Sequence, residues 1–124
     1  MILDSDILID ILRGYPEAVK WLADQSKLQT VSGIAAIELA YGCTDAAGLR
    51  AARRLIAVFE VVWPEPIDVQ AAYGLASLHL SGGIDGPDAI TAAIALRLGV
   101  PVATFNTKHF RAVPGLTIEQ PYVR

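Results

Sequence analysis

The chain has 124 residues, of which 53% are hydrophobic and 19% charged, and its formal net charge is -3. These values predict one globular domain over residues 1–124 with a sizeable core, and they exclude a disordered chain. The negative charge also excludes a uniformly basic surface, so any contact with nucleic acid must come from a local basic patch. The surplus of apolar residues indicates a protein partner or a dimer.

Signals for targeting, disulfides and membranes are absent from the sequence. Cys43 is the only cysteine, which predicts a reducing, cytoplasmic location without a disulfide framework. Asp4, Asp6 and Asp10 interrupt the apolar N-terminal run, so it does not resemble a signal peptide. No stretch approaches the roughly 20 uninterrupted apolar residues of a membrane span, and we expect no membrane association.

Short apolar strands alternate with helical patterns along the chain. We predict strands at 2–4, 28–32, 61–63, 101–105 and 116–119, and helices at 5–13, 16–25, 34–41, 45–59, 68–80 and 87–98. Ser5 or Asp6 is expected to cap the first helix and Asp68 the fifth, with a loop at 81–83. The alternation is typical of an α/β protein with three layers (α/β/α) and a central parallel sheet of four to five strands.

The first candidate site residue, Asp4, directly follows the first apolar strand. Ligands of parallel α/β sheets bind beyond the carboxyl ends of the strands, so Asp4 is placed where chemistry is expected. The second candidate, Glu38, lies in a helix with apolar residues on every side, where a carboxylate is unfavourable without compensation. An Arg partner or a half-exposed helix flank would explain Glu38 without any function.

Two further oxygen-bearing side chains occur at comparable positions. Asp88 lies in the first turn of an apolar helix, although Asp85 as N-cap with Asp88 three residues later would also form an ordinary acidic helix start. Asn106 follows the buried strand at 101–105, where Asn is also common as a turn residue. In a parallel sheet whose order reverses beside the first strand, these strand ends and helix starts converge at one crevice.

Several carboxylates crowd together only with a cation, because like charges raise one another's pKa. Mg²⁺ or Mn²⁺ takes carboxylate, amide and water oxygens, whereas His79, His109 and Cys43 show no spacing suited to zinc. An ion held by Asp and Glu with open water positions suits phosphodiester hydrolysis. The ion would activate a water molecule and stabilise charge on the attacked phosphate.

Four segments of the chain together resemble the PIN domain, in particular the VapC-type ribonuclease toxins of type II toxin–antitoxin systems. Residues 2–9 resemble the family's apolar-Asp-[Ser/Thr]-[Asn/Asp] opening, and residues 31–42 its Glu helix followed by Gly. Residues 88–95 resemble its Asp-x-Leu-Ile-Ala-Ala-x-Ala helix, and residues 102–110 its Thr-x-[Asn/Asp]-x-x-[Asp/His]-Phe strand end. Each segment is weakly specific alone, but the set of four is specific and covers nearly the whole chain.

The resemblance implies a Mg²⁺- or Mn²⁺-dependent endoribonuclease in which Asp4, Glu38 and Asp88 bind the metal and are catalytic. Asn106 stands where many members have a fourth acid, which leaves open whether one or two ions bind. The other candidate metal ligands are Asp6, Asp85 and Asn106. The side chains expected to hydrogen-bond the carboxylates or the attacking water are Ser5, Thr104 and Asn106.

The partners implied by the resemblance are an RNA substrate, a cognate antitoxin and a second copy of the chain. Candidate phosphate contacts are the basic side chains expected near the crevice: Arg13, Lys108, His109 and Arg111. For each of them a solvated surface loop is the alternative. The charged helix face of Arg50, Arg53 and Arg54 is either solvated or close to the antitoxin.

Other functions stay open at this stage. A housekeeping PIN nuclease in RNA processing would share every feature above. A phosphatase of the haloacid-dehalogenase plan also begins with Asp-x-Asp after a strand, but Ile7 stands where Thr or Val is expected and Glu38 would have no role. A PIN-like module could bind RNA or protein without cleavage, although three of four acids are intact. The identity of the RNA has no readable code in the sequence.

Overall fold

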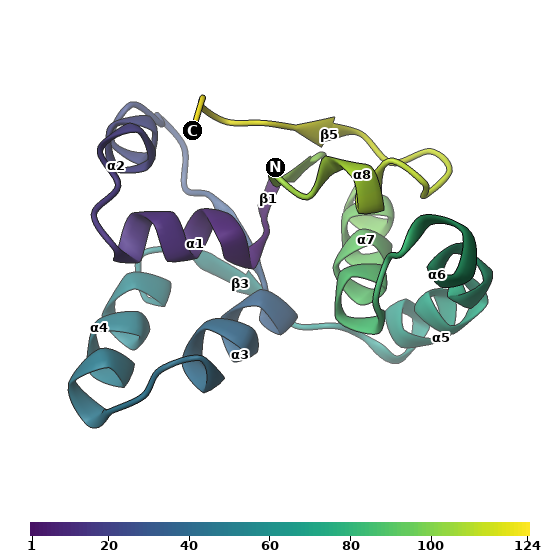
Figure 1. The fold of residues 1–124 in the computed structure, drawn as a ribbon, viewed down its shortest axis with the longest axis horizontal. Coiled ribbons are helices and arrows are strands. Elements are labelled where there is room, and N and C mark those ends of the chain that lie inside the picture. Colours follow the sequence, from purple (N-terminus) through teal and green to yellow (C-terminus); the bar gives the residue numbers. More distant parts are fainter.

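A computed structural model describes all 124 residues and shows a five-stranded sheet in the order β3-β2-β1-β4-β5 (Figure 1). Every neighbouring pair of strands is parallel. The strands are β1 (Ile2–Leu3), β2 (Thr30–Ser32), β3 (Glu60–Val62), β4 (Val102–Ala103) and β5 (Ile118–Glu119). The predicted α/β class with a parallel sheet is confirmed, and each predicted strand has a counterpart of two or three residues.

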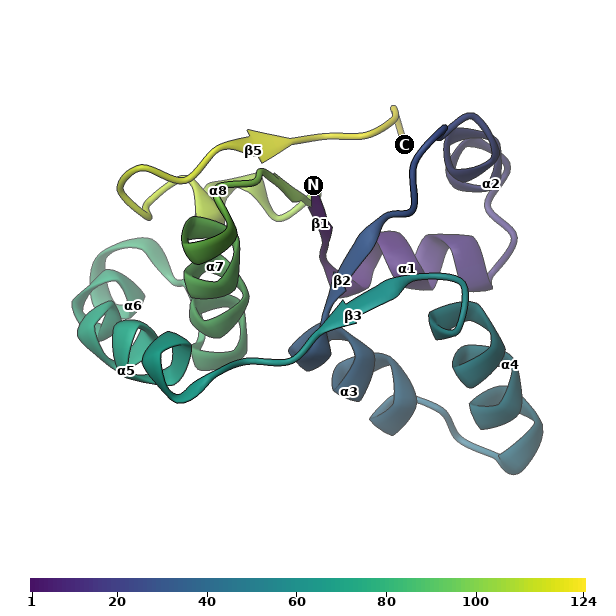
Figure 2. The same ribbon diagram turned by 180° about the vertical axis from the view of Figure 1, so that it is seen from behind.

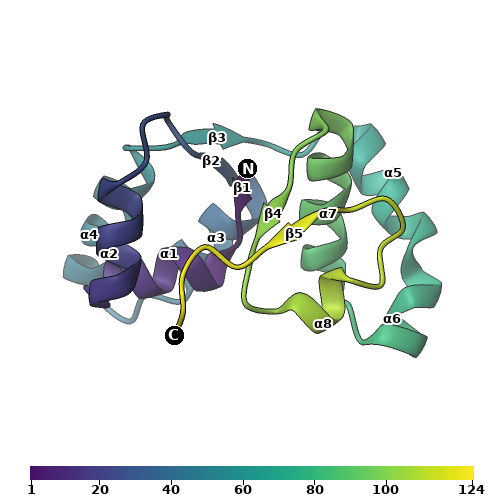
Figure 3. The same cartoon turned by 90° about the horizontal axis from the view of Figure 1, so that it is seen from above.

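Eight helices cover the two faces of this sheet (Figures 1 and 3). On one face lie α1 (Ser5–Leu12), α2 (Pro16–Ala23), α3 (Gly33–Tyr41) and α4 (Ala46–Ile56), and on the other α5 (Pro66–Gly74), α6 (Ala76–Gly82), α7 (Gly86–Leu98) and α8 (Thr107–Phe110). None of these helices combines the length and the apolar character that a membrane span requires.

Alternation along the strands divides the core between the two faces. Successive side chains of a strand point to opposite sides of a sheet. Leu3 and Ala103 therefore join the cluster under α1, α3 and α4, while Ile2 and Val102 join the cluster under α7 and α8. All four side chains are fully buried, which fixes the register of β1 against β4.

The sheet order reverses beside β1, as the convergence argument requires. From β1 the chain proceeds outward through β2 to β3, which lie side by side in Figure 2, and then crosses back to place β4 on the other side of β1. The carboxyl ends of β1 and β4 thus face one crevice at a topological switch point, the usual ligand position in such sheets.

The predicted helix over 68–80 is wrong in its boundaries. The structure has two helices instead, and the chain leaves helical geometry between them at Leu75 (φ -91°, ψ 4°). The first of them begins at Pro66 with Glu65 as N-cap, because proline suits a first turn. Helix α6 then extends into the predicted loop, and Gly83 ends it with φ 79°.

Three smaller expectations also differ from the structure. Asp4 itself is the N-cap of α1, in place of Ser5 or Asp6. Helix α4 ends at Ile56, and Phe59 is buried in the turn that leads to β3. The four-residue helix α8 was not predicted, because so short a segment carries no periodic pattern.

Candidate active site

Asp4 lies buried at the carboxyl end of β1, with 4% of its surface exposed. Its Oδ1 accepts a hydrogen bond from the backbone N–H of Ser5 at 2.8 Å. Its Oδ2 accepts one from the hydroxyl of Thr104 at 2.9 Å, across the gap between β1 and β4. Ser5 thus contributes its backbone rather than its hydroxyl, whereas Thr104 orients the carboxylate with its side chain.

Asp6 joins the start of α1 to the end of β4. Its Oδ2 accepts a hydrogen bond from the backbone N–H of Phe105 at 2.8 Å and lies 3.3 Å from the Thr104 hydroxyl. Its Oδ1 accepts from the backbone N–H of Ile7 at 2.8 Å. A carboxylate offers about four lone-pair positions, so these donors leave Asp6 little capacity for an ion. Asp6 is accordingly suited to hold the two elements together.

Asp88 brings the start of α7 to the same crevice, and 8% of its surface is exposed. Its backbone N–H donates to Oδ1 of Asp85 at 2.8 Å, so Asp85 is the N-cap expected from the sequence. The Asp88 carboxylate receives one side-chain hydrogen bond, from Nδ2 of Asn106 at 3.3 Å. Most of its oxygen lone pairs are therefore free for another ligand.

The carboxylates of the crevice share an unfavourable electrostatic environment. Burial raises the pKa of Asp4 to about 7, and the charge on Asp6 adds to this effect. Burial, followed by the charge on Asp4, raises the pKa of Asp88 to about 7 as well. The ion pairs of the structure involve other acids, namely Asp10, Glu65 and Asp68. Neither Asp4 nor Asp88 therefore forms an ion pair with a protein cation.

Glu38 differs from the expectation of a carboxylate enclosed by apolar side chains. It is exposed on α3 and forms no ion pair with an arginine, so the helix-flank alternative describes its placement. Partial desolvation, followed by the charge on Asp85, raises its pKa. The charge on Glu38 also contributes to the raised pKa of Asp4 and of Asp88. Glu38 therefore lies close enough to the crevice to interact electrostatically with both carboxylates.

Hard divalent cations fit the chemistry of this crevice. Carboxylate oxygens without a basic partner are the donors that Mg²⁺ and Mn²⁺ prefer. No three His, Cys, Asp or Glu side chains converge closely enough to enclose an ion without help. Mg²⁺ in proteins commonly keeps several water ligands and needs few carboxylates, so the donor set remains compatible with it.

The four basic candidates lie in three different environments. Lys108 and Arg111 are exposed on and just after α8, beside Asn106. Arg13 is exposed at the far end of α1 from Asp4. His109 is half-buried, and its Nδ1 lies 2.9 Å from Nδ2 of Asn106. The structure thus leaves Lys108 and Arg111 exposed close in sequence to Asn106, whereas it turns the His109 ring toward the Asn106 side chain.

Sequence reasoning missed a cluster of hydrogen bonds that holds the C-terminal segment against α1. Arg124 binds both carboxylate oxygens of Asp10 at 3.0 Å, and the Tyr122 hydroxyl donates to Asp10 at 2.7 Å. The Arg124 guanidinium lies 4.4 Å from the ring centroid of Phe105, the residue whose N–H binds Asp6. No sequence signal links positions 114 residues apart.

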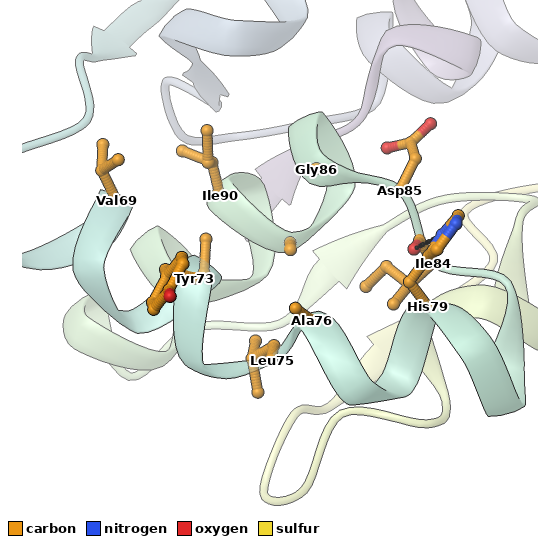
Figure 4. A pocket seen from close by; sticks show the side chains of 11 residues that line it. Val69, Tyr73, Leu75, Ala76, His79, Ile84, Asp85, Gly86 and Ile90 are labelled. Carbon is orange, nitrogen blue, oxygen red and sulfur yellow. Dashed lines mark hydrogen bonds between the residues drawn. The ribbon is translucent and has the colours of Figure 1, made fainter.

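An apolar pocket of about 440 Å³ lies beside the crevice, between α5, α6 and α7 (Figure 4). Val69, Tyr73 and Ile90 contribute to its lining, and Asp85 stands at its edge. The Nδ1 atom of His79 lies 2.8 Å from the Ile84 carbonyl, so this ring is engaged by the backbone. The pocket lacks the convergent polar groups of a catalytic site.

Comparison with known proteins places this geometry in context. The sequence model of the PIN domain family matches residues 1–116. A toxin–antitoxin complex from Klebsiella pneumoniae is 26% identical (TM-score 0.78; 98% of this chain, 97% of that chain). VapBC2 of Rickettsia felis, solved with promoter DNA, is 20% identical (0.77; 95% and 96%). VapC20 of Mycobacterium tuberculosis, described as a sarcin–ricin-loop-cleaving toxin, is 16% identical (0.76; 94% and 95%). No curated protein sequence matches the chain.

Proposed function

The chain belongs to the PIN domain family, and on that basis we propose that it is a Mg²⁺- or Mn²⁺-dependent endoribonuclease and the toxin of a type II toxin–antitoxin pair. The observation that carries the proposal is the pair of buried carboxylates, Asp4 and Asp88, at the switch point without a protein cation. The toxin–antitoxin complex from Klebsiella pneumoniae supports the toxin assignment, and the RNA-cleaving VapC20 supports RNA as the substrate. We expect it to act in the cytoplasm.

In this proposal Asp4 and Asp88 would bind the metal ion directly, and Glu38, at the edge of the crevice, would act on it through the water ligands that such an ion keeps. A bound divalent ion supplies an activated water and stabilises negative charge on the attacked phosphate. The protein contributes orientation, because Thr104 fixes one oxygen of Asp4 and the Ser5 N–H fixes the other. Asp6 serves mainly to connect α1 to the end of β4 by its hydrogen bond with the Phe105 N–H, and Asp85 serves mainly as the N-cap of α7.

The exposed cations near the crevice are proposed to bind the RNA backbone. Lys108 and Arg111 lie beside Asn106 at the rim, and Arg13 would contact a more distant phosphate. The overall charge of -3 opposes the approach of RNA, so these few local cations must provide the attraction. Binding should weaken as salt increases, in proportion to the phosphates contacted.

Cleavage of structured RNAs by the purified chain tests the proposal. We expect cutting with Mg²⁺ or Mn²⁺, none with EDTA, and a loss of about 100-fold or more in the Asp88→Asn variant. Asp24→Asn is the matched control, because it makes the same chemical change at the exposed end of α2. Metal-independent cutting that survives Asp88→Asn would refute the proposal.

We also propose that the chain forms a homodimer and binds a cognate antitoxin. Large apolar side chains are exposed from the end of β3 along α5: Trp63 (59%), Ile67 (62%) and Tyr73 (86%). Three large apolar side chains this exposed within eleven residues are the reason for proposing a protein contact along this segment. Sedimentation should show a dimer that Ile67→Asp dissociates, whereas Leu28→Asp, at another exposed apolar site, should leave it intact. A monomeric wild-type chain would contradict the dimer, and cleavage unaffected by the antitoxin would contradict that pairing.

A further inference from the structure

The His109 ring is held between Asn106 and the bare backbone of Gly83. Its Nδ1 lies 2.9 Å from the Asn106 side-chain nitrogen. A Cβ atom built on Gly83 would lie 3.1 Å from Nε2 and 3.4 Å from Cδ2 of the ring. The close approach of the ring therefore depends on the absence of a side chain at Gly83. A ring fixed on both edges is poorly placed to reach out to an RNA phosphate, contrary to the sequence-based expectation.

Chemistry determines the direction of the hydrogen bonds around Asn106. Its Nδ2 lies 3.3 Å from Oδ2 of Asp88, and an ionised carboxylate only accepts hydrogen bonds. Nδ2 therefore points one hydrogen toward Asp88 and has a second hydrogen for His109. Nδ1 of His109 must then be the acceptor, so the ring proton resides on Nε2.

We propose that His109 is a positioning residue that holds the Asn106 amide with its nitrogen toward Asp88. In the opposite orientation, Oδ1 of Asn106 would face the Asp88 carboxylate, one acceptor against another, and the tautomer of His109 with an unprotonated Nδ1 disfavours that orientation. Asn106 thus acts as a hydrogen-bond donor that orients Asp88, rather than as a fourth oxygen ligand of a metal ion. The catalytic consequence rests on the proposed nuclease function, whereas the hydrogen-bond geometry does not.

Asn106 also supports the other side of the crevice. Its backbone N–H donates to the Thr104 hydroxyl at 2.9 Å, and that hydroxyl donates to Asp4. A displaced Asn106 would therefore disturb the orientation of both Asp4 and Asp88. An aspartate at position 106 could make the backbone contact but could not donate to Asp88, which explains why an amide is suited to this arrangement.

Two substitutions separate positioning from phosphate binding. His109→Asn retains an acceptor near the Nδ1 position without a cationic form, whereas His109→Lys supplies a cation without an acceptor. We expect His109→Lys to lower kcat about 10-fold or more with KM within about twofold, because small displacements of reacting groups are costly. His109→Asn should keep kcat within about threefold of the wild type. A raised KM in His109→Asn together with unchanged kinetics in His109→Lys would overturn the proposal in favour of a phosphate contact.

A spectroscopic measurement tests the same geometry without cleavage. Long-range ¹⁵N–¹H NMR spectra of the wild-type chain in EDTA at about pH 8, where Asp88 with its pKa of about 7 is mostly ionised, should show His109 with its proton on Nε2 and with Nδ1 as an acceptor. The side-chain amide of Asn106 should exchange slowly in the wild type and in His109→Asn, but rapidly in His109→Lys. A proton on Nδ1, or an Asn106 amide unaffected in His109→Lys, would overturn the inference. Because this readout needs no substrate, failure to cut RNA would count against the nuclease proposal alone.

Discussion

Replacing Asp4 by asparagine is expected to abolish RNA cleavage and, in the same chain without metal, to increase the free energy of unfolding at pH 8. Activity is lost because an amide carries no charge with which to hold a divalent ion. Stability is gained because burial raises the pKa of Asp4 from its usual 3.8 to about 7. Ionised Asp4 therefore opposes folding at pH 8, and asparagine retains the N-cap of α1.

The pH dependence has a definite sign. Between about pH 4 and pH 7 the folded chain holds the Asp4 proton and the unfolded chain does not, so stability falls as the pH rises through this window. At 1.36 kcal/mol per pH unit, the interval corresponds to an upper value of about 4 kcal/mol for this one carboxyl. We expect Asp4→Asn to recover about 2 kcal/mol or more of it.

Denaturant unfolding in EDTA at pH 5 and pH 8 measures this effect. The wild type should lose stability between these values, and Asp4→Asn should lose less because one of the titrating carboxyls is gone. Mn²⁺ should stabilise the wild type more than the variant, since an ion that binds only the folded state favours folding. An Asp4→Asn protein less stable than the wild type at pH 8 would show that Asp4 is a structural residue.

Replacing Asp68 by asparagine is expected to have the opposite effect on stability, a loss of about 2–3 kcal/mol, without loss of cleavage. Asp68 is also buried, at 2% exposure, but its Oδ1 and Oδ2 lie 2.9 and 3.0 Å from Nε and Nη2 of Arg97. Its Oδ2 also accepts from the Glu65 N–H at 2.8 Å. The Asp68–Arg97 pair joins the first turn of α5 to the last turn of α7, whereas Asp88 lies in the first turn of α7.

Acid unfolding distinguishes this carboxyl from the active-site pair. The hydrogen bonds from Arg97 hold the pKa of Asp68 below 3.8, so its contribution is present above about pH 4 and disappears as the pH falls through its folded value. Wild type and Asp68→Asn should therefore differ at pH 7 and converge in strong acid. Glu65→Gln is the control, because its carboxylate is exposed and 3.4 Å from Arg97, and it should cost less than about 1 kcal/mol. Equal losses in the two variants would show that burial of the pair is unimportant.

The architecture and most of the site could be predicted, because both follow from local patterns. An apolar strand that ends in a polar residue predicted the placement of Asp4 and Asn106 after β1 and β4. The reversal of strand order beside β1 brings these two strand ends to one crevice, where both residues contact the Thr104 hydroxyl. The PIN family match supports the nuclease interpretation over the phosphatase one, in which Glu38 had no role. These features depend on periodicity and sequence order, which one sequence displays directly.

Features set by distant partners could not be predicted. Asp68 was expected to cap a helix because its pairing with Arg97, 29 residues later, leaves no trace in the sequence. His109 was expected to face RNA because its contacts with Asn106 and Gly83 depend on how α6 and α8 pack together. Glu38 was expected to be enclosed, but its neighbours along α3 do not reveal which flank of the helix stays open.

The pairing of β1 with β4 has a consequence for the timing of synthesis. Asp4 is translated 100 residues before Thr104, whose hydroxyl orients the Asp4 carboxylate. Until β4 has been translated, β1 can pair only with β2, and the side of the crevice that β4 forms is missing. A nascent chain that stops short of β4 therefore lacks the assembled acidic site. The order of synthesis therefore keeps the acidic site unassembled until β4 has been translated.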